Sequence, residues 1–212
     1  MIDLYTWTTP NGRKVSILLE ELGLPYTVHA IDIGNDAQFA PDFLKISPNN
    51  RIPAIVDRKT GMSLMESGAI MLYLAGEHKR FTVEGPEYWR MVEWLMWQMG
   101  GLGPMLGQAH HFLKFNKGTS EYAETRYGTE ARRLYSVLEA RLDGRDFVVG
   151  PGAGTYTIAD MAIFPWIARF EWHQVDLNAY PNVRDWYLRL AVRPAVQKGY
   201  HVPKFVTDIP MP

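Results

Sequence analysis

The first third of the chain carries a clear helical period of apolar side chains. From Arg13 onward they recur at the spacing i, i+3, i+4 and i+7, which marks one face of an α-helix. The residues on this face are Val15, Leu18, Leu19 and Leu22. Gly23 and Pro25 follow directly, so we expect the helix to end at Leu22, because glycine is a common C-terminal cap and proline cannot continue a helix.

Short β-type segments stand on both sides of this helix. Segments bounded by glycine, proline or polar turns predict strands at residues 2–6, 26–33, 53–56 and 63–65. A second helix is expected at residues 39–46, and a third begins near Ser67, marked by Ile70, Tyr73 and Leu74. The predicted order, β-α-β-α-β-β-α in about 78 residues, resembles the thioredoxin-like α/β layout.

The remainder of the chain reads as helical. Long helical segments are predicted at residues 87–115 and 121–142. The motif Thr157-Ile158-Ala159-Asp160 has the form of a capping box and should begin a helix that Pro165 bends. The predicted organisation is an α/β domain at 1–78, a linker at 79–86, an all-α domain at 87–200 and an irregular tail at 201–212.

Two features of the helical part invite a cofactor interpretation that their context does not support. The segment Gly100-Gly101-Leu102-Gly103-Pro104 lacks the lysine and the preceding strand of a phosphate loop, so we interpret it as a bend. His110 and His111 could suggest a metal site, but adjacent side chains point in different directions on a helix. A structural role is expected for them, and we expect no metal.

The composition argues against several classes of function. The 212 residues include 22 basic and 23 acidic side chains, for a net charge of −1, so nothing favours nucleic-acid binding. Asp3 follows Met1 and Ile2, where a secretory signal would have basic residues, and no apolar run approaches the roughly 20 residues of a membrane span. We therefore expect a cytoplasmic protein without membrane association.

Cysteine is absent from the chain. Its absence excludes disulfide staples, cysteine-ligated zinc and a thiol nucleophile supplied by the protein. Any sulfur chemistry must therefore use the sulfur of a ligand.

The stretch from Ser47 to Ser67 could hold a peptide. A loop with two prolines feeds a short apolar strand, a turn at Gly61 returns it, and Glu66 and Ser67 open the next helix. Simpler explanations remain open on the residues alone. Ile52-Pro53 could merely start a strand, and Glu66 and Ser67 could merely cap a helix.

Several motifs together resemble the cytosolic glutathione transferases, most closely their Nu class, whose bacterial members resemble the fungal nitrogen-regulatory homologue. The resemblance covers nearly the whole chain. Its motifs are Thr9-Pro10-Asn11-Gly12, Gln38-Phe39, the segment Ser47 to Asp57, Glu66-Ser67-Gly68-Ala69-Ile70 and the segment Gly100 to Gln108.

The resemblance implies a set of residues that hold the tripeptide glutathione, as GSH or as the disulfide GSSG. Pro53 is expected to be cis, so that the backbone of Ile52 can pair with the cysteinyl unit. Glu66 and Ser67 would take the ammonium and carboxylate of the γ-glutamyl group at a helix N-terminus. Gln38 and Arg51 would lie near the glycyl carboxylate, although a solvated surface role remains open for both.

The reactive end has no cysteine, serine or tyrosine in the loop after the first strand. The resemblance assigns Thr9 and Asn11 instead, which would hydrogen-bond the sulfur and lower the pKa of the bound thiol. Thr9-Pro10 is also a plain helix cap, and both roles are compatible. Arg126 matches a Nu-class arginine that reaches toward glutathione disulfide, with a surface salt bridge as the alternative.

These residues favour a glutathione-dependent disulfide-bond oxidoreductase that acts on small disulfides. Two alternatives remain open: a transferase that conjugates electrophiles or reduces peroxides, and a non-catalytic regulatory protein on the same scaffold. The resemblance also implies a homodimer.

Overall fold

The computed structural model describes residues 1–212, which form two compact units. The first comprises Met1–Arg80 and Ala191–Ile209, and the second comprises Phe81–Leu190 and Pro210–Pro212. The boundary after Arg80 falls inside the predicted linker at 79–86. Helix α9 (Pro194–Tyr200) groups with the first unit, so the units divide the C-terminal residues differently from the predicted domains.

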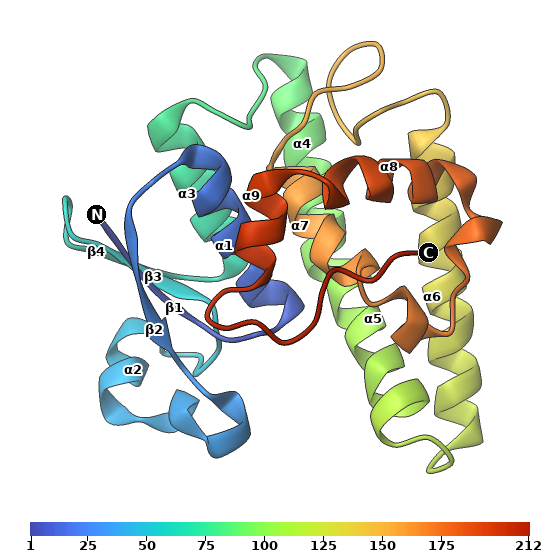
Figure 1. Ribbon diagram of the computed structural model, residues 1–212, viewed down its shortest axis with the longest axis horizontal. Coiled ribbons are helices and arrows are strands. Elements are labelled where there is room, and N and C mark those ends of the chain that lie inside the picture. Colours follow the sequence, from blue (N-terminus) through green and yellow to red (C-terminus); the bar gives the residue numbers. More distant parts are fainter. The chain divides into compact units, whose positions relative to one another are not determined.

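The first unit is built on a four-stranded sheet (Figure 1). Its order is β2-β1-β3-β4, with β1 parallel to β2 and antiparallel to β3, and β3 antiparallel to β4. The element order confirms the predicted thioredoxin-like α/β domain. Its elements are β1 (Ile2–Thr6), α1 (Pro10–Leu22), β2 (Tyr26–Ala30), α2 (Pro41–Ile46), β3 (Ala54–Asp57), β4 (Met62–Met65) and α3 (Ser67–His78).

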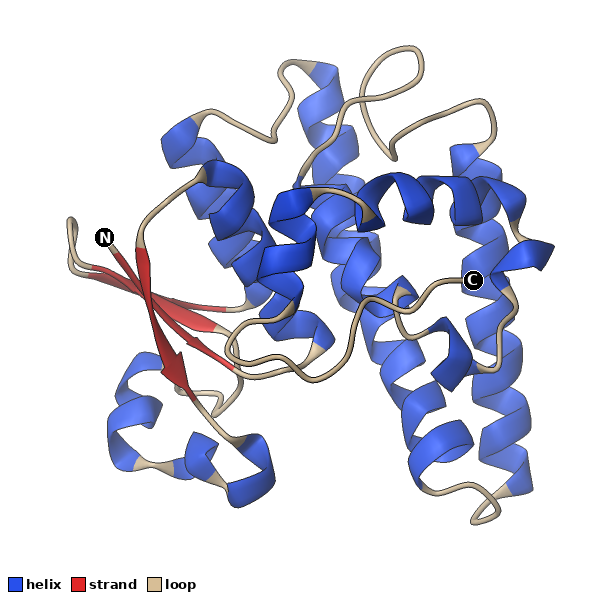
Figure 2. Ribbon diagram, in the orientation of Figure 1, coloured by secondary structure: helices blue, strands red, loops and turns tan.

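Helices cover both faces of the sheet, with α1 and α3 on one side and α2 on the other (Figure 2). Successive side chains of β1 point to opposite faces of the sheet and so contact both layers of helices. The ring of Tyr5 lies 4.5 Å from that of His29 and 6.1 Å from that of Phe43 in α2. Its neighbour Leu4 therefore points to the opposite face, where it is fully buried.

Strands β3 and β4 differ from the predicted bounds by one residue, and three larger differences have local reasons. Helix α1 begins at Pro10 because the Thr9 side chain caps it. Strand β2 ends at Ala30 because the Asp32 carboxylate accepts a hydrogen bond from the N–H of Gly34 (2.9 Å) and starts a 3-10 turn at Ile33–Asn35. A second such turn, Ala37–Phe39, precedes α2 and delays its start to Pro41.

Helix α9 packs along α1. Gly199 makes the close approach possible, because a Cβ there would lie 2.6 Å from the Cα of Ile17. The Ser16 hydroxyl donates to the Gly199 carbonyl at 2.6 Å. Arg193, just before α9, forms an ion pair with Glu21 at 2.6 Å. The C-terminal part of the chain therefore completes the cover over α1.

The second unit is all-α. The predicted bend at Gly100 to Pro104 is a π-helical turn, Gln98–Leu102, within a nearly continuous helical path, and Pro104 has no N–H to sustain the α-helical bond at that point. A second π-helical turn, His110–Phe115, follows. The helices are α4 (Pro86–Trp97), α5 (Gly103–Ala109), α6 (Glu121–Leu142), α7 (Ile158–Ile167) and α8 (Pro181–Ala191), with 3-10 turns at Phe170–His173 and Leu177–Ala179.

The predicted capping box begins α7, and Pro165 lies inside that helix. Every residue of α7 is buried, so this helix forms the centre of the unit. Across the whole structure, none of the helices combines the length and the apolar character needed to traverse a lipid bilayer.

Candidate functional site

The register of the strands places most of the predicted site residues of the first unit at one end of the sheet. Tyr5 pairs with Ala54, and Ala54 pairs with Met65, so β1 and β4 end where β3 begins. Because β2 runs parallel to β1 and pairs Ala30 with Thr6, it ends there too. The loops that leave this end carry Thr9 and Asn11, Gln38, Arg51 to Pro53, and Glu66 with Ser67.

The first of these loops forms the N-terminus of α1. The Thr9 hydroxyl oxygen accepts a hydrogen bond from the N–H of Gly12 at 3.2 Å, which confirms the cap. A hydroxyl has one proton and two acceptor lone pairs, so this cap leaves the O–H of Thr9 able to donate. Asn11 is the second residue of α1, and both side chains are partly exposed. Gly12 is required here, because a Cβ would clash with the Trp7 carbonyl oxygen.

The loop before β3 is fixed by a hydrogen bond from a buried serine. The buried Ser47 hydroxyl donates to the carbonyl of Arg51 at 2.8 Å. The Ile52-Pro53 peptide bond is cis, as the resemblance implies. The β3–β4 ladder starts at Ala54, so Ile52 lies just outside it, at the end of the inner strand β3. An extended segment can pair with backbone groups in such a position.

Glu66 occupies an unusual backbone conformation, with φ 68° and ψ 112°. A non-glycine residue in such a region costs about 1–3 kcal/mol, and such residues cluster at functional sites. Its side chain makes no capping hydrogen bond and is exposed, so it is not simply the cap of α3. A carboxylate held in this way is available to an ammonium group.

Ser67 is the first residue of α3 and is 3% exposed. Beneath it lies Lys14 of α1, which is 1% exposed, with Nζ 3.5 Å from Ser67 Oγ. Burial lowers the pKa of Lys14 to about 7, and the negative charge of Glu66 partly opposes this. No local pattern in the sequence marks Lys14, because lysine is usually exposed and its burial here involves a contact with Ser67, which is distant in the chain.

Gln38 and Arg51 differ in their surroundings. The Gln38 amide nitrogen donates to Asp36 at 3.4 Å, while its Oε1 atom is buried without a hydrogen-bond partner. Buried amide oxygens normally have a partner, so this atom is a candidate ligand contact. The Arg51 side chain is exposed, and its role stays a prediction.

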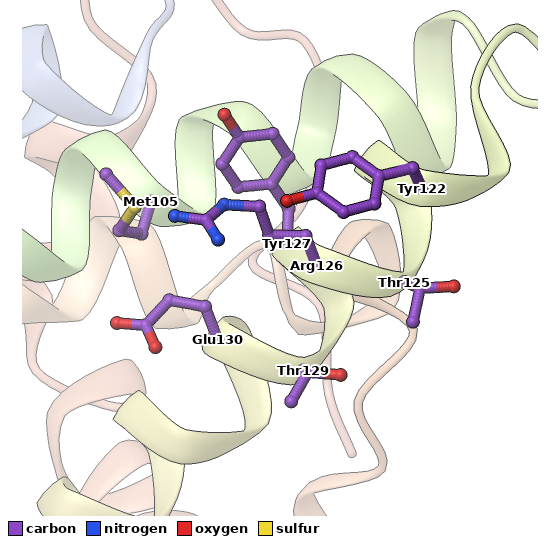
Figure 3. Close-up of a pocket in the computed structure, with 7 residues that line it drawn as sticks. All are labelled: Met105, Tyr122, Thr125, Arg126, Tyr127, Thr129 and Glu130. Atoms are coloured by element: carbon purple, nitrogen blue, oxygen red, sulfur yellow. The ribbon is translucent and has the colours of Figure 1, made fainter.

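Arg126 belongs to the other compact unit, on α6. It lines a cavity of about 580 Å³ that Met105, Tyr122 and Glu130 also line. Figure 3 shows the Arg126 guanidinium and the Glu130 carboxylate on the side of Met105, with Thr125 and Thr129 pointing away. A hydrogen bond from Arg133, followed by the charges of Arg133 and Arg126, lowers the pKa of Glu130.

His110 lies in the core of the second unit. Its Nε2 lies 2.6 Å from Nε2 of His173, whose Nδ1 lies 2.8 Å from the Tyr135 hydroxyl. Burial is the main cause that lowers the pKa of both imidazoles, to about 3 for His110. His111 is exposed, and no group of three or more histidine and carboxylate side chains is arranged to hold a metal ion.

Comparisons with known proteins show the family of this chain. The family model described as "Glutathione S-transferase, N-terminal domain" matches residues 1–76, and "Glutathione S-transferase, C-terminal domain" matches residues 121–189. The chain is 47% identical over 201 residues to the disulfide-bond oxidoreductase YfcG of Escherichia coli (strain K12), covering 92% of each protein.

Solved structures extend the likeness to three dimensions. A glutathione transferase family member from Pseudomonas fluorescens pf-5, with two glutathiones bound, superposes with a TM-score of 0.89 at 40% identity, covering 95% of this chain and 93% of that one. A glutathione transferase from Pseudomonas putida, with one glutathione disulfide bound per subunit, superposes with a TM-score of 0.89 at 39% identity, covering 95% and 91%. The chain therefore belongs to the glutathione S-transferase family.

Proposed function

We propose that this protein is a glutathione-dependent disulfide-bond oxidoreductase. The observation that carries the proposal is a helix N-terminus with two polar side chains, Thr9 and Asn11, at the end of the sheet where the cis Ile52-Pro53 bond precedes β3. The chain has no cysteine. Such a site can activate the thiol of a ligand but has none of its own. The 47% identical YfcG, named a disulfide-bond oxidoreductase, supports the same reaction.

Glutathione would lie in an extended conformation at this end of the sheet. The backbone of Ile52 would pair with the cysteinyl unit, beside Pro53. Glu66 would bind the ammonium of the γ-glutamyl group, and Ser67 with the N-terminus of α3 would bind its carboxylate. At the other end of the tripeptide, Gln38 with its buried amide oxygen and the exposed Arg51 are proposed near the glycyl residue.

The reaction is two thiol–disulfide exchanges. The thiolate of bound glutathione attacks one sulfur of a small disulfide, a new S–S bond forms as the old one breaks, and the leaving thiolate takes a proton from solvent. A second glutathione thiolate attacks the mixed disulfide and releases the second thiol, leaving glutathione disulfide. Two glutathiones thus supply the two electrons, and the protein is not oxidised.

The protein's part is to stabilise the attacking thiolate. The Thr9 hydroxyl, whose oxygen caps α1, donates its proton to the sulfur, and the Asn11 amide donates beside it. The N-terminus of α1 adds the positive end of its dipole. Together these favour the thiolate and lower the pKa of the bound thiol. The Arg126 contact with glutathione disulfide is part of the proposal and rests on the family resemblance.

We further infer that the protein is a Nu-class, cytoplasmic homodimer. The motifs Thr9-Pro10-Asn11-Gly12 and Glu66-Ser67 support the class. A reducing compartment suits a reaction that consumes reduced glutathione, and a chain without cysteine has no structural disulfide to lose there.

A steady-state assay tests the function directly. Hydroxyethyl disulfide and glutathione should be turned over, with the product disulfide followed through glutathione reductase. Thr9→Ala and Asn11→Ala should each lower kcat/KM by about tenfold or more, because each removes a hydrogen bond to a charged sulfur. The matched control is Thr8→Ala, the neighbouring threonine, which should retain wild-type turnover.

The same preparation distinguishes the alternatives. Conjugation of chlorodinitrobenzene that exceeds disulfide turnover would identify a transferase instead. Tight glutathione binding with neither activity would identify a regulatory protein. Full disulfide turnover by both alanine variants would show that the reactive end has been assigned to the wrong residues.

A further inference from the structure

A lysine lies buried beneath the helix start where the γ-glutamyl group is proposed to bind. Lys14 is on α1, one turn beyond Asn11, and is 1% exposed. Its Nζ lies 3.5 Å from the hydroxyl of Ser67, the first residue of α3. Lysine is almost never buried to this extent unless it is paired.

We propose that Lys14 is a positioning residue for the amino-acid end of glutathione. It places a positive charge beside Ser67, behind the N-terminus of α3, where the α-carboxylate of the ligand is proposed to bind. The inference rests on the proposed glutathione site and adds a residue that has no place in the sulfur chemistry itself.

The hydrogen-bonding capacity of Ser67 sets the direction of its proton. An ammonium group can only donate, so Lys14 can engage only a lone pair of the Ser67 oxygen. The single O–H of Ser67 is then directed away from Lys14. At 3.5 Å the contact is long, so charge is the larger part of the effect, since a buried charge acts strongly through a medium of low dielectric.

The ionisation of Lys14 makes this role measurable. Burial lowers its pKa to about 7, so charged and neutral forms are nearly balanced at neutral pH. A carboxylate bound nearby favours the charged form and raises the pKa, so binding takes up a proton. Affinity for the carboxylate should accordingly be highest below pH 7 and decrease as the pH rises and Lys14 loses its proton.

Other charged groups around α1 have their own partners or lie farther along it. On α3, Glu66 is the charge that acts on Lys14, and it favours the charged form. Beside Lys14 on α1, Arg13 donates to the Tyr200 carbonyl at 2.9 Å. Arg193 and Lys198 pair with Glu21 and Glu20. On α3, the Tyr73 hydroxyl donates to Asp57 at 2.7 Å, and Glu77 and His78 lie at the far end of the helix. Tyr200 and His201 lie at the end of α9, and Asp3 on the sheet pairs with Arg58.

Calorimetry with three S-methylated tripeptides tests the proposal without a free thiol. S-methylglutathione has both γ-glutamyl charges, a glutaryl analogue lacks the ammonium, and a 4-aminobutyryl analogue lacks the α-carboxylate. Lys14→Met should weaken binding of the first two by about tenfold or more, the expected loss for a contact with a charged group, and leave the third unchanged. Arg13→Met is the control, because it removes a buried cation of the same helix that contacts Tyr200.

Equal losses for all three ligands, or the same selectivity in Arg13→Met, would overturn the proposal. A second measurement uses only the wild-type protein, so it tests the proposal even if the Lys14→Met variant does not fold. Between pH 7 and 8, binding of the glutaryl analogue, which has no amine to titrate, should take up a fraction of a proton per site, while the 4-aminobutyryl analogue should cause no such uptake. No uptake with the glutaryl analogue would contradict the role of Lys14.

The outcomes also separate this inference from the proposed function. A wild-type protein that binds none of the three tripeptides would remove the glutathione site altogether. A wild-type protein that reduces hydroxyethyl disulfide, combined with a Lys14→Met variant that shows no selective loss, would remove only the role of Lys14.

Discussion

Asp160 connects three parts of the helical unit through its two carboxylate oxygens. One oxygen accepts hydrogen bonds from the N–H of Val148 at 2.9 Å and from the indole of Trp186 at 3.0 Å. The other accepts from the N–H of Thr157 at 3.0 Å. The group is fully buried, and burial raises its pKa although these bonds favour the charged form. A single side chain therefore holds the loop, the helix start and α8 together.

Replacing this carboxylate should cost stability and leave the chemistry intact. Asp160→Asn puts an amide donor where one oxygen accepted, so it should lower the free energy of unfolding by about 3 kcal/mol, and Thr157→Ala by about 1 kcal/mol. Urea denaturation measures both. Asp185→Asn is the control, because its ion pair with Arg184 is on the surface and should contribute little. A change below about 1 kcal/mol in Asp160→Asn would contradict the network described here.

At the scale of elements, α1 is the most connected helix of the first unit. Its N-terminus carries Thr9 and Asn11, its body carries the buried Lys14, and its sides pack on α3 and α9. The close packing along α9 depends on Gly199, which leaves no room for a side chain beside Ile17. The geometry of the proposed sulfur site thus depends on how well α9 supports the same helix.

A methyl group at this contact should force the helices apart. Gly199→Ala places a Cβ 2.6 Å from the Cα of Ile17, a backbone atom that cannot swing aside, and should destabilise the protein by about 1–3 kcal/mol. Gly76→Ala in α3 is the control, since a Cβ there meets nothing within 4 Å, and it should be neutral or slightly stabilising. Equal unfolding midpoints for the two variants would show that the α1–α9 contact tolerates a methyl group.

At the scale of the whole molecule, the two units differ in how much the sequence predicts. The order of helices and strands in the first unit was predicted from the spacing of apolar residues and from the glycines and prolines that end each element. Both signals depend on local geometry. The bounds of α6 agree with the predicted 121–142, where Ser120 caps the helix. The burial of Lys14 and the grouping of α9 with α1 depend on contacts between distant residues. No local pattern encodes them, and lysine is usually exposed.

The buried histidine pair predicts how the whole protein responds to acid. His110 and His173 have folded-state pKa values below the usual 6.5, so the folded form stays neutral while the unfolded form takes up protons as the pH falls below 6.5. Their stabilisation is therefore complete above about pH 6.5 and is lost below it, by about 1.4 kcal/mol per pH unit for each imidazole.

Urea midpoints between pH 7.5 and 5 measure this loss, in a range where most carboxylates remain ionised. Below pH 6.5, His110→Gln should reduce the slope of the free energy of unfolding against pH by the contribution of one imidazole. The exposed neighbour supplies the control, since His111→Gln should keep the wild-type slope. A wild-type stability that does not change between pH 6.5 and 5 would contradict the buried neutral pair.

The position of α9 has a consequence for the order in which the protein is made. Residues 191–209 are part of the same compact unit as residues 1–80, although more than a hundred residues separate them. A ribosome releases the sheet and α1 early, but the surface of α1 that receives Gly199 stays uncovered until α9 has emerged. The helical unit, by contrast, is almost complete in residues 81–190. The unit that is synthesised first is therefore completed last, and nascent chains that stop before α9 leave Ser16 and Ile17 on this face of α1 without the cover of α9.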